Sequence, residues 1–102
     1  PVALSTDCNP GSSPTTSLPF IMNLACMKMG MTPAEAITAC TINAAHAINR
    51  GKDIGSLEVG KKADIVMMNV PNYMQLPYHY GMNHTDMVIK NGKIVLENGQ
   101  LC

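Results

Sequence analysis

The apolar residues of this sequence change their spacing near the midpoint, and that change limits the folds the chain can adopt. Residues 15–50 carry apolar side chains at three- and four-residue intervals, whereas residues 63–97 carry short continuous or alternating apolar runs. The first pattern is typical of helices and the second of strands. We therefore expect an α/β chain in which a mainly helical first half is followed by an antiparallel second half.

Two helices are predicted in the first half. Residues 15–29 form the first, which Gly30 ends. The second begins at Thr32 as N-cap, with Pro33 at the first helical position and Glu35 completing a capping box, and it ends near residues 49–51. The expected packing stripe of the first helix is Leu18, Ile21, Leu24, Ala25 and Lys28, and that of the second is Ala34, Ile37, Thr41, Ala44, Ala45 and Ile48. The methionines near the first helix are expected to fill the core: Met22, Met27, Met29 and Met31.

The second half contains a strand and a hairpin. Residues 63–70 form a strand whose apolar run at 65–68 is too continuous for exposure on either face. A long loop over residues 71–85 follows. Residues 86–90 and 93–97 then form a hairpin around Asn91-Gly92, the sequence favoured in two-residue turns, and Asn98-Gly99 is a candidate second turn.

The opening stretch carries Asp7, the ionisable group whose position best suits a catalytic role. Residues 2–6 read as a short buried strand that ends at Asp7, and residues 7–14 form a Pro/Gly/Ser loop. In parallel α/β folds, chemistry lies at the carboxyl ends of strands, which makes Asp7 a candidate catalytic residue. Asp7 as a helix cap or turn residue, and Asn9-Pro10-Gly11 as plain turn chemistry, remain alternatives.

Charge and composition argue against several partners. Seven basic and seven acidic residues give zero net charge, so we expect no nucleic acid or membrane surface as partner. The longest uncharged stretch, residues 8–27, is interrupted by Pro and Gly and does not predict a membrane span. The four cysteines lack metal-binding spacing, which favours a disulfide-free, cytoplasmic chain. Because Pro1 already lies in an apparent strand, the chain reads as a piece of a longer protein.

The remaining ionisable residues favour structural roles. His46 is expected to pack or cap, and Lys61-Lys62 to form a solvated turn. His79 and His84 lie five residues apart in a polar loop, but a metal pair there would need a third ligand nearby. Cys8, beside Asp7, is the one cysteine for which reactivity is of interest.

Two sets of motifs resemble the metal-dependent amidohydrolase superfamily. Residues 55–66 and 88–95 resemble its carboxy-terminal part, where a small β-sandwich adjoins a (β/α)8 barrel, and residues 41–45 resemble the helix before it. The loop at residues 5–13 and residues 76–83 resemble one hydrolase of this superfamily, which opens the ring of 4-imidazolone-5-propanoate to N-formimidoyl-L-glutamate in histidine degradation. The resemblance implies a last barrel strand, active-site loop and two helices in residues 1–50, and a β-sandwich segment in residues 51–102.

The resemblance also implies roles for individual residues. Asp7 would bind zinc or iron and pass a proton from the activated water to the leaving ring nitrogen. Asn9 and Gly11 would contact the formimidoyl-glutamate end of the small-molecule ligand, and Ser12 the imidazolone propanoate. The superfamily's histidine ligands precede the aspartate, whereas all three histidines here follow it. We therefore expect this chain alone to lack most of the metal site and to be inactive.

Two other classes of function stay open. The strands with unpaired edges would suit a non-enzymatic, self-associating structural domain, and they favour a homo-oligomer. Another cyclic-amide or amidine hydrolase or deaminase of the same superfamily is the third reading.

Overall fold

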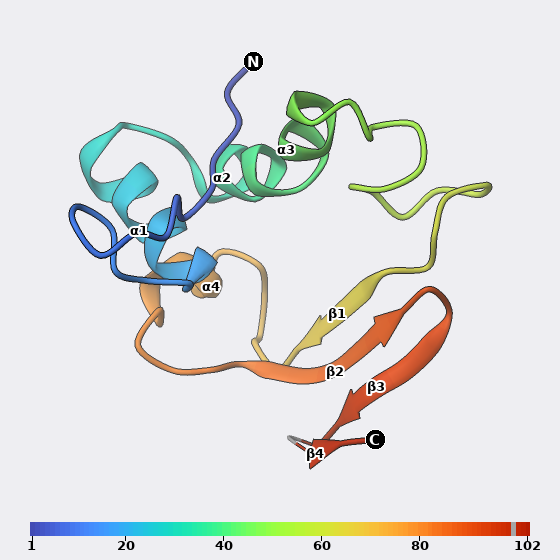
Figure 1. Cartoon of the computed structure of the whole chain (residues 1–102). Helices are drawn as coiled ribbons and strands as arrows, with labels where there is room; N and C mark the ends of the chain where they lie inside the picture. Colours follow the sequence, from blue (N-terminus) through green and yellow to red (C-terminus); the bar gives the residue numbers. More distant parts are fainter. Residues whose placement is uncertain (99) are drawn as a thin grey trace.

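The helical first half and the sheet of the second half lie on opposite sides of the molecule (Figure 1). The computed structural model describes residues 1–98 and 100–102. Its elements are α1 (Leu18–Lys28), α2 (Pro33–Cys40), α3 (Ile42–Ala47), β1 (Ile65–Met68), α4 (Gln75–Tyr78), β2 (Thr85–Lys90), β3 (Lys93–Glu97) and β4 (Gln100–Leu101). The strands pair antiparallel in the order β1-β2-β3-β4, which confirms the expected α/β class with an antiparallel second half.

Helix α1 begins and ends close to the predicted positions. The Ser17 hydroxyl caps its first turn by accepting from the Phe20 N–H at 3.4 Å, and Gly30 follows its end at φ 72°. The predicted packing stripe was only partly right, because Met22 and Ala25 are the buried residues of α1. Three members of that stripe, Leu18, Leu24 and Lys28, are exposed.

Helix α2 has the predicted capping box. The Thr32 hydroxyl accepts from the Glu35 N–H at 3.2 Å, and the Glu35 carboxylate accepts from the Thr32 N–H at 2.9 Å. The single long second helix was wrong, because the backbone breaks at Thr41, with φ −114° and ψ −92°, before α3. Thr41 donates its hydroxyl to the Ile37 carbonyl at 2.8 Å, a back-bond that bends helices.

The break at Thr41 changes which residues face the interior. The buried residues of α2 and α3 are alanines: Ala36, Ala39 and Ala45. Of the predicted stripe, Ala45 is buried, whereas Ala34, Thr41 and Ile48 are exposed. Small side chains at these positions let α1 and α2 approach closely.

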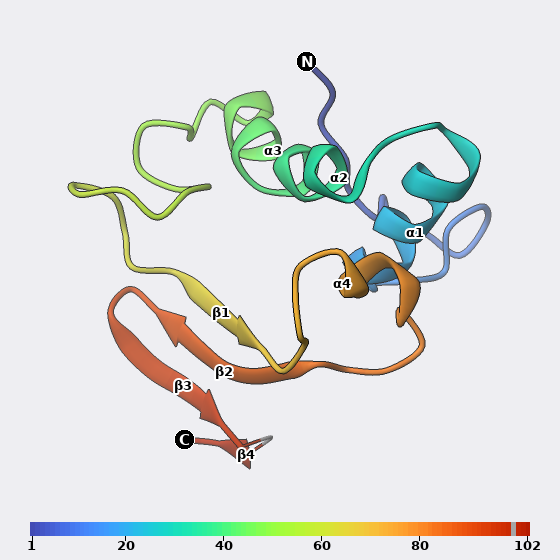
Figure 2. The same ribbon diagram turned by 180° about the vertical axis from the view of Figure 1, so that it is seen from behind.

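The core joins the helices to a short helix that the sequence did not predict. Met22 and Ala25 of α1, Ala36 of α2 and Leu76 of α4 form the buried cluster. Helix α4 lies within the expected 71–85 loop and packs beside α1 in both views (Figures 1 and 2).

Two polar or aromatic contacts fix α4 against α1. The Asn23 side chain donates to the Pro77 carbonyl at 3.0 Å, and the Phe20 and Tyr80 rings lie 5.4 Å apart. Met22 confirms the prediction that methionine fills the core, and Met31 packs against it. Met27 and Met29 are exposed, so the prediction was wrong for them.

The β2–β3 hairpin confirms the Asn91-Gly92 turn. Both residues have positive φ, 51° and 80°, as a type I′ turn requires. Asp64 anchors the turn, since its carboxylate accepts from the Asn91 N–H and from Lys90 Nζ, each at 2.8 Å. Asn98 has φ 52°, as a turn would require, whereas its predicted turn partner Gly99 lies outside the described residues.

Strand β1 is shorter and more exposed than predicted. It spans Ile65–Met68 rather than residues 63–70, and Val66 and Met67 are about half exposed. The prediction of burial on both faces was therefore wrong for this structure, because β1 lies at the edge of a single sheet layer.

The strand predicted at residues 2–6 is not formed. This stretch has no regular secondary structure, and two hydrogen bonds tie it to the helices: Leu4 N–H donates to the Ala39 carbonyl at 3.0 Å, and the Asn43 side chain donates to the Val2 carbonyl at 2.8 Å. A parallel strand needs a neighbouring strand for its backbone groups, and the described residues place none beside it.

Two further observations concern predicted absences. All four cysteines are free, with Cys8 and Cys102 exposed and Cys26 and Cys40 partly buried. In the described part of the chain, no helix combines the length and hydrophobicity that crossing a bilayer would demand.

Candidate functional site

The loop after Asp7 is organised around the side chain of Asn9. Its Oδ1 accepts from the Gly11 N–H at 2.9 Å and the Ser12 N–H at 2.8 Å, and its Nδ2 donates to the Asp7 carbonyl at 2.7 Å. Asn side chains close turns in this way by substituting for a backbone carbonyl. The structure thus brings together the four residues singled out in the sequence: Asp7, Asn9, Gly11 and Ser12.

Asp7 adopts a backbone conformation that is uncommon for a non-glycine residue. Its φ is 45°, in the left-handed region, and its side chain is exposed. Among the described residues, no side-chain or backbone donor is hydrogen-bonded to its carboxylate. Both carboxylate oxygens are therefore available to an external cation or proton donor.

Ser13 completes the loop, and the sequence reading did not assign it a role. Its hydroxyl donates to the Thr6 carbonyl at 2.6 Å, and its carbonyl accepts from the Asn9 N–H at 2.9 Å in an isolated antiparallel bridge. The second serine of the Gly-Ser-Ser sequence was the available signal, because serine hydroxyls commonly bond backbone groups in turns.

Asp7, the metal ligand implied by the resemblance, does not lie in a complete metal site within the described residues. An exposed carboxylate suits zinc or iron. Within residues 1–98 and 100–102, however, no three His, Cys, Asp or Glu side chains gather as a metal site would require. Zinc or iron at Asp7 would therefore need ligands from outside this chain.

The hydrogen bonds and ring contacts of the three histidines in the described residues do not involve Asp7. His46 packs over Gly51, where a Cβ would collide with its ring, in agreement with a packing role. The His79 and His84 rings are 6.2 Å apart, and His84 Nε2 lies 2.8 Å from the His79 carbonyl oxygen. That contact occupies one ring nitrogen of His84 and leaves the other free, but the described residues place no third His, Cys, Asp or Glu near the pair to complete a metal site.

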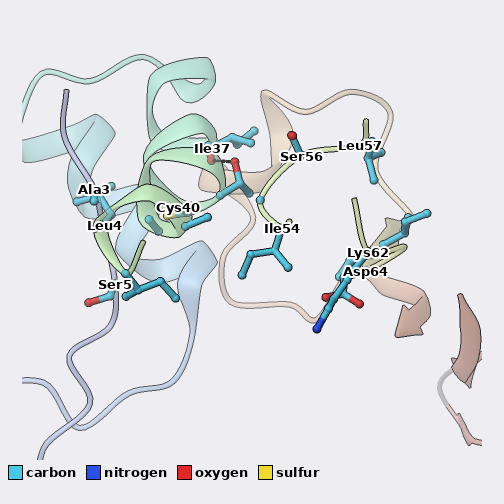
Figure 3. Close-up of a pocket in the computed structure, with 18 residues that line it drawn as sticks. Ala3, Leu4, Ser5, Ile37, Cys40, Ile54, Ser56, Leu57, Lys62 and Asp64 are labelled. Atoms are coloured by element: carbon cyan, nitrogen blue, oxygen red, sulfur yellow. Dashed lines mark hydrogen bonds between the residues drawn. The ribbon is translucent and has the colours of Figure 1, made fainter. Parts of the chain in front are cut away.

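An open apolar groove of about 830 Å³ lies between the opening segment, α2 and α3, and β1. Figure 3 shows Leu4 and Cys40 at one side of it and Ile54 and Leu57 at the other. Burial raises the pKa of the Cys40 thiol, which leaves it less nucleophilic. Asp7 does not line the groove, so the groove is not part of the Asp7 site.

The lead-in to β1 carries ion pairs rather than a binding site. Lys61 contacts the Glu58 carboxylate at 2.8 Å, and the Ser56 hydroxyl donates to the same carboxylate at 2.6 Å. These two contacts hold the pKa of Glu58 below its ordinary value. Lys62, next to it, is exposed, so the expectation of a solvated turn describes Lys62 but not Lys61.

Comparison with known proteins shows the family to which this chain belongs. A model of the amidohydrolase family matches residues 1–95. The chain belongs to the amidohydrolase family.

The relatives that it matches narrow the comparison further. The chain is 76% identical over 101 residues to the imidazolonepropionase of Geobacillus sp. (strain WCH70), covering 99% of this chain and 24% of that protein. It is 67% identical over 101 residues to the imidazolonepropionase of Geobacillus kaustophilus (strain HTA426), with the same coverage. These similarities confirm the predicted relationship to imidazolonepropionases. The chain spans about a quarter of the length of these curated relatives.

A solved structure supports the fold. The crystal structure of a triazine hydrolase variant superposes with a TM-score of 0.76 at 20% identity, covering 91% of this chain and 24% of that one. The arrangement of helices followed by a sheet is therefore shared with a larger hydrolase structure.

Proposed function

We propose that this chain supplies the Asp7 loop to the active site of an imidazolonepropionase-type hydrolase that opens the ring of 4-imidazolone-5-propanoate. The observation that carries the proposal is the Asp7 loop itself, in which Asn9 gathers Gly11 and Ser12 beside an exposed carboxylate. The 76% identity to an imidazolonepropionase supports it.

Residues 1–50 would contribute the last barrel strand, the active-site loop and helices, and residues 51–102 would contribute strands of the β-sandwich. In the present structure residues 2–6 lack a strand partner. Neighbouring strands from the rest of an enzyme would provide one, and the carboxyl end of the completed strand would then present Asp7.

Asp7 would act as a metal ligand and as a proton carrier. A zinc or iron ion at this position would supply a water molecule acidified for attack at neutral pH. The second oxygen of the Asp7 carboxylate would accept a proton and return it to the leaving ring nitrogen. Asn9, Gly11 and Ser12 would lie against the carboxylate and carbonyl oxygens of the ligand, with the Ser12 hydroxyl as a donor, since the Gly11 and Ser12 N–H groups already donate to Asn9. Small-molecule hydrolysis in the cytoplasm is the expected setting.

An intact enzyme tests this proposal. The matching segment of the Geobacillus sp. (strain WCH70) enzyme is replaced by this chain, and ring opening is followed by mass spectrometry of N-formimidoyl-L-glutamate. We expect the chimera to be active and Asp7→Asn to lower kcat by about 10²–10⁴-fold. Asp86→Asn makes the same chemical change on the exposed face of β2 and should leave kcat unchanged. An Asp7→Asn chimera with wild-type kcat would refute the role of Asp7.

A second candidate is self-association through β1. Val66 and Met67 are about half exposed on this edge strand, and such edges pair readily with another copy. Sedimentation of the chimera, with and without Val66→Lys, tests this reading, since the charge should lower the oligomer mass only if β1 lies in the interface.

A further inference from the structure

The two peptide units that flank Asp7 are each held by a side chain from the following loop. The Ser13 hydroxyl donates to the Thr6 carbonyl, which belongs to the peptide before Asp7, at 2.6 Å. The Asn9 side chain donates to the Asp7 carbonyl, which belongs to the peptide after it, at 2.7 Å. Fixing both peptide planes fixes the two backbone dihedrals of Asp7 and hence the direction of its Cα–Cβ bond.

The two residues that hold Asp7 are themselves joined through their backbones. The Asn9 N–H donates to the Ser13 carbonyl at 2.9 Å, and the Thr15 N–H donates to the same oxygen at 2.8 Å. The Asn9 Oδ1 is occupied by the Gly11 and Ser12 N–H groups. Asn9 and Ser13 thus form a closed clamp rather than two independent contacts.

Asp7 needs such support because of its backbone conformation. At φ 45° an L-residue is in the left-handed region, where its Cβ crowds the following carbonyl oxygen, so this conformation is less favourable than the right-handed one. Outlying conformations of this kind persist where surrounding contacts over-determine them, and they cluster at functional sites.

We propose that Ser13 is a positioning residue of this enzyme: together with Asn9, it holds the backbone of Asp7 in the left-handed conformation and so aims the carboxylate. This inference rests on the proposed function. It assigns a role to Ser13, and it gives Asn9 a task besides contact with the ligand.

The test uses the chimeric enzyme, with kcat, KM and metal content measured on the folded fraction. Removing a group that orients a metal ligand typically lowers metal affinity or activity roughly 10–100-fold. We expect Ser13→Ala to lower kcat or metal content by that factor with little change in KM, and Ser13→Thr, which keeps the hydroxyl, to restore both. Ser5→Ala is the matched control, because Ser5 is exposed and its hydroxyl has no hydrogen bond to the described residues.

The outcomes separate the inference from the function on which it rests. Loss of activity in Asp7→Asn with normal kcat and metal content in Ser13→Ala would overturn the clamp alone. Full activity in Asp7→Asn would overturn the proposed function. A Ser13→Ala enzyme with a lower Tm but unchanged kcat per folded molecule would also overturn the clamp.

The other half of the clamp provides a second variant if Ser13→Ala does not fold. Asn9→Asp keeps the oxygen that accepts from Gly11 and Ser12 but removes the donor to the Asp7 carbonyl. It should reproduce the loss of kcat or metal content, and normal values for both would overturn the proposal.

Discussion

Replacing Gly55 by alanine should destabilise the chain more than the same change at Gly60. Both glycines have strongly positive φ, 96° and 94°. A Cβ at Gly55 would lie 2.7 Å from the Ala45 Cβ and 3.1 Å from the Ile42 Cα, whereas at Gly60 it would meet no atom of the described residues within 4 Å. Comparing the Gly55→Ala and Gly60→Ala variants therefore separates the cost of backbone strain from the cost of steric crowding.

The expected magnitudes follow from these two contributions. Alanine in the unfavourable φ region costs about 1–2 kcal/mol at either position. Overpacking adds about 1–3 kcal/mol at Gly55 only, because α3 supplies the backbone atom that blocks the new methyl group. The difference between the two variants should thus be about 1–3 kcal/mol, and for a domain of this size each kcal/mol lowers Tm by roughly 4–8 °C.

Urea unfolding of the 102-residue chain, followed by circular dichroism, measures both free energies by linear extrapolation. The double variant Ala45→Gly/Gly55→Ala opens space at the closest contact and should recover part of the crowding cost, seen as non-additivity. Equal losses of stability for Gly55→Ala and Gly60→Ala would refute the argument that Gly55 is required for close packing against α3.

Three further predictions concern caps and thiols. Thr32→Ala removes the α2 cap and should cost about 1 kcal/mol in unfolding free energy. Hydrogen bonds from Thr32 lower the pKa of Glu35 in the folded state. The stability from this contact is therefore fully present above the unfolded pKa of about 4.3 and is lost as pH falls through the folded pKa. Thr32→Ala should raise the Glu35 pKa in an NMR titration and should weaken the dependence of unfolding free energy on pH in this range. Iodoacetamide should label exposed Cys8 well before Cys40, whose thiol pKa is raised by burial, as peptide mass spectrometry would show; equal labelling rates would contradict this.

Local sequence signals predicted the features that depend on few neighbouring residues. The capping box of α2 and the Asn91-Gly92 turn each depend on residues within three or four positions, and both were confirmed. The α/β order was likewise predictable from apolar spacing.

Features that depend on distant contacts were missed. Helix α4 is stabilised by its packing against α1, with Asn23 bonded to Pro77 across 54 positions, and no local pattern marks it. The opening stretch has the composition of a strand, but strand formation needs a partner strand. The site shows the same division. The sequence placed Asp7 and Asn9 in one loop, whereas the hydrogen bond from Ser13 to Thr6 becomes visible only in the folded loop.

The strand order has a consequence for how the chain folds. Each strand pairs with its neighbour along the chain, and the β2–β3 and β3–β4 pairings join residues of short sequence separation, whereas the β1–β2 pairing spans the segment that contains α4. The helices α1, α2 and α3 also pack on their neighbours in the chain. The contact between α1 and α4 closes a much longer loop of the chain. The entropic cost of closing that loop must be met before packing of α4 on α1 can stabilise the fold. We therefore expect the helical unit and the hairpin to form rapidly and separately, with docking of α4 onto α1 as the slow step.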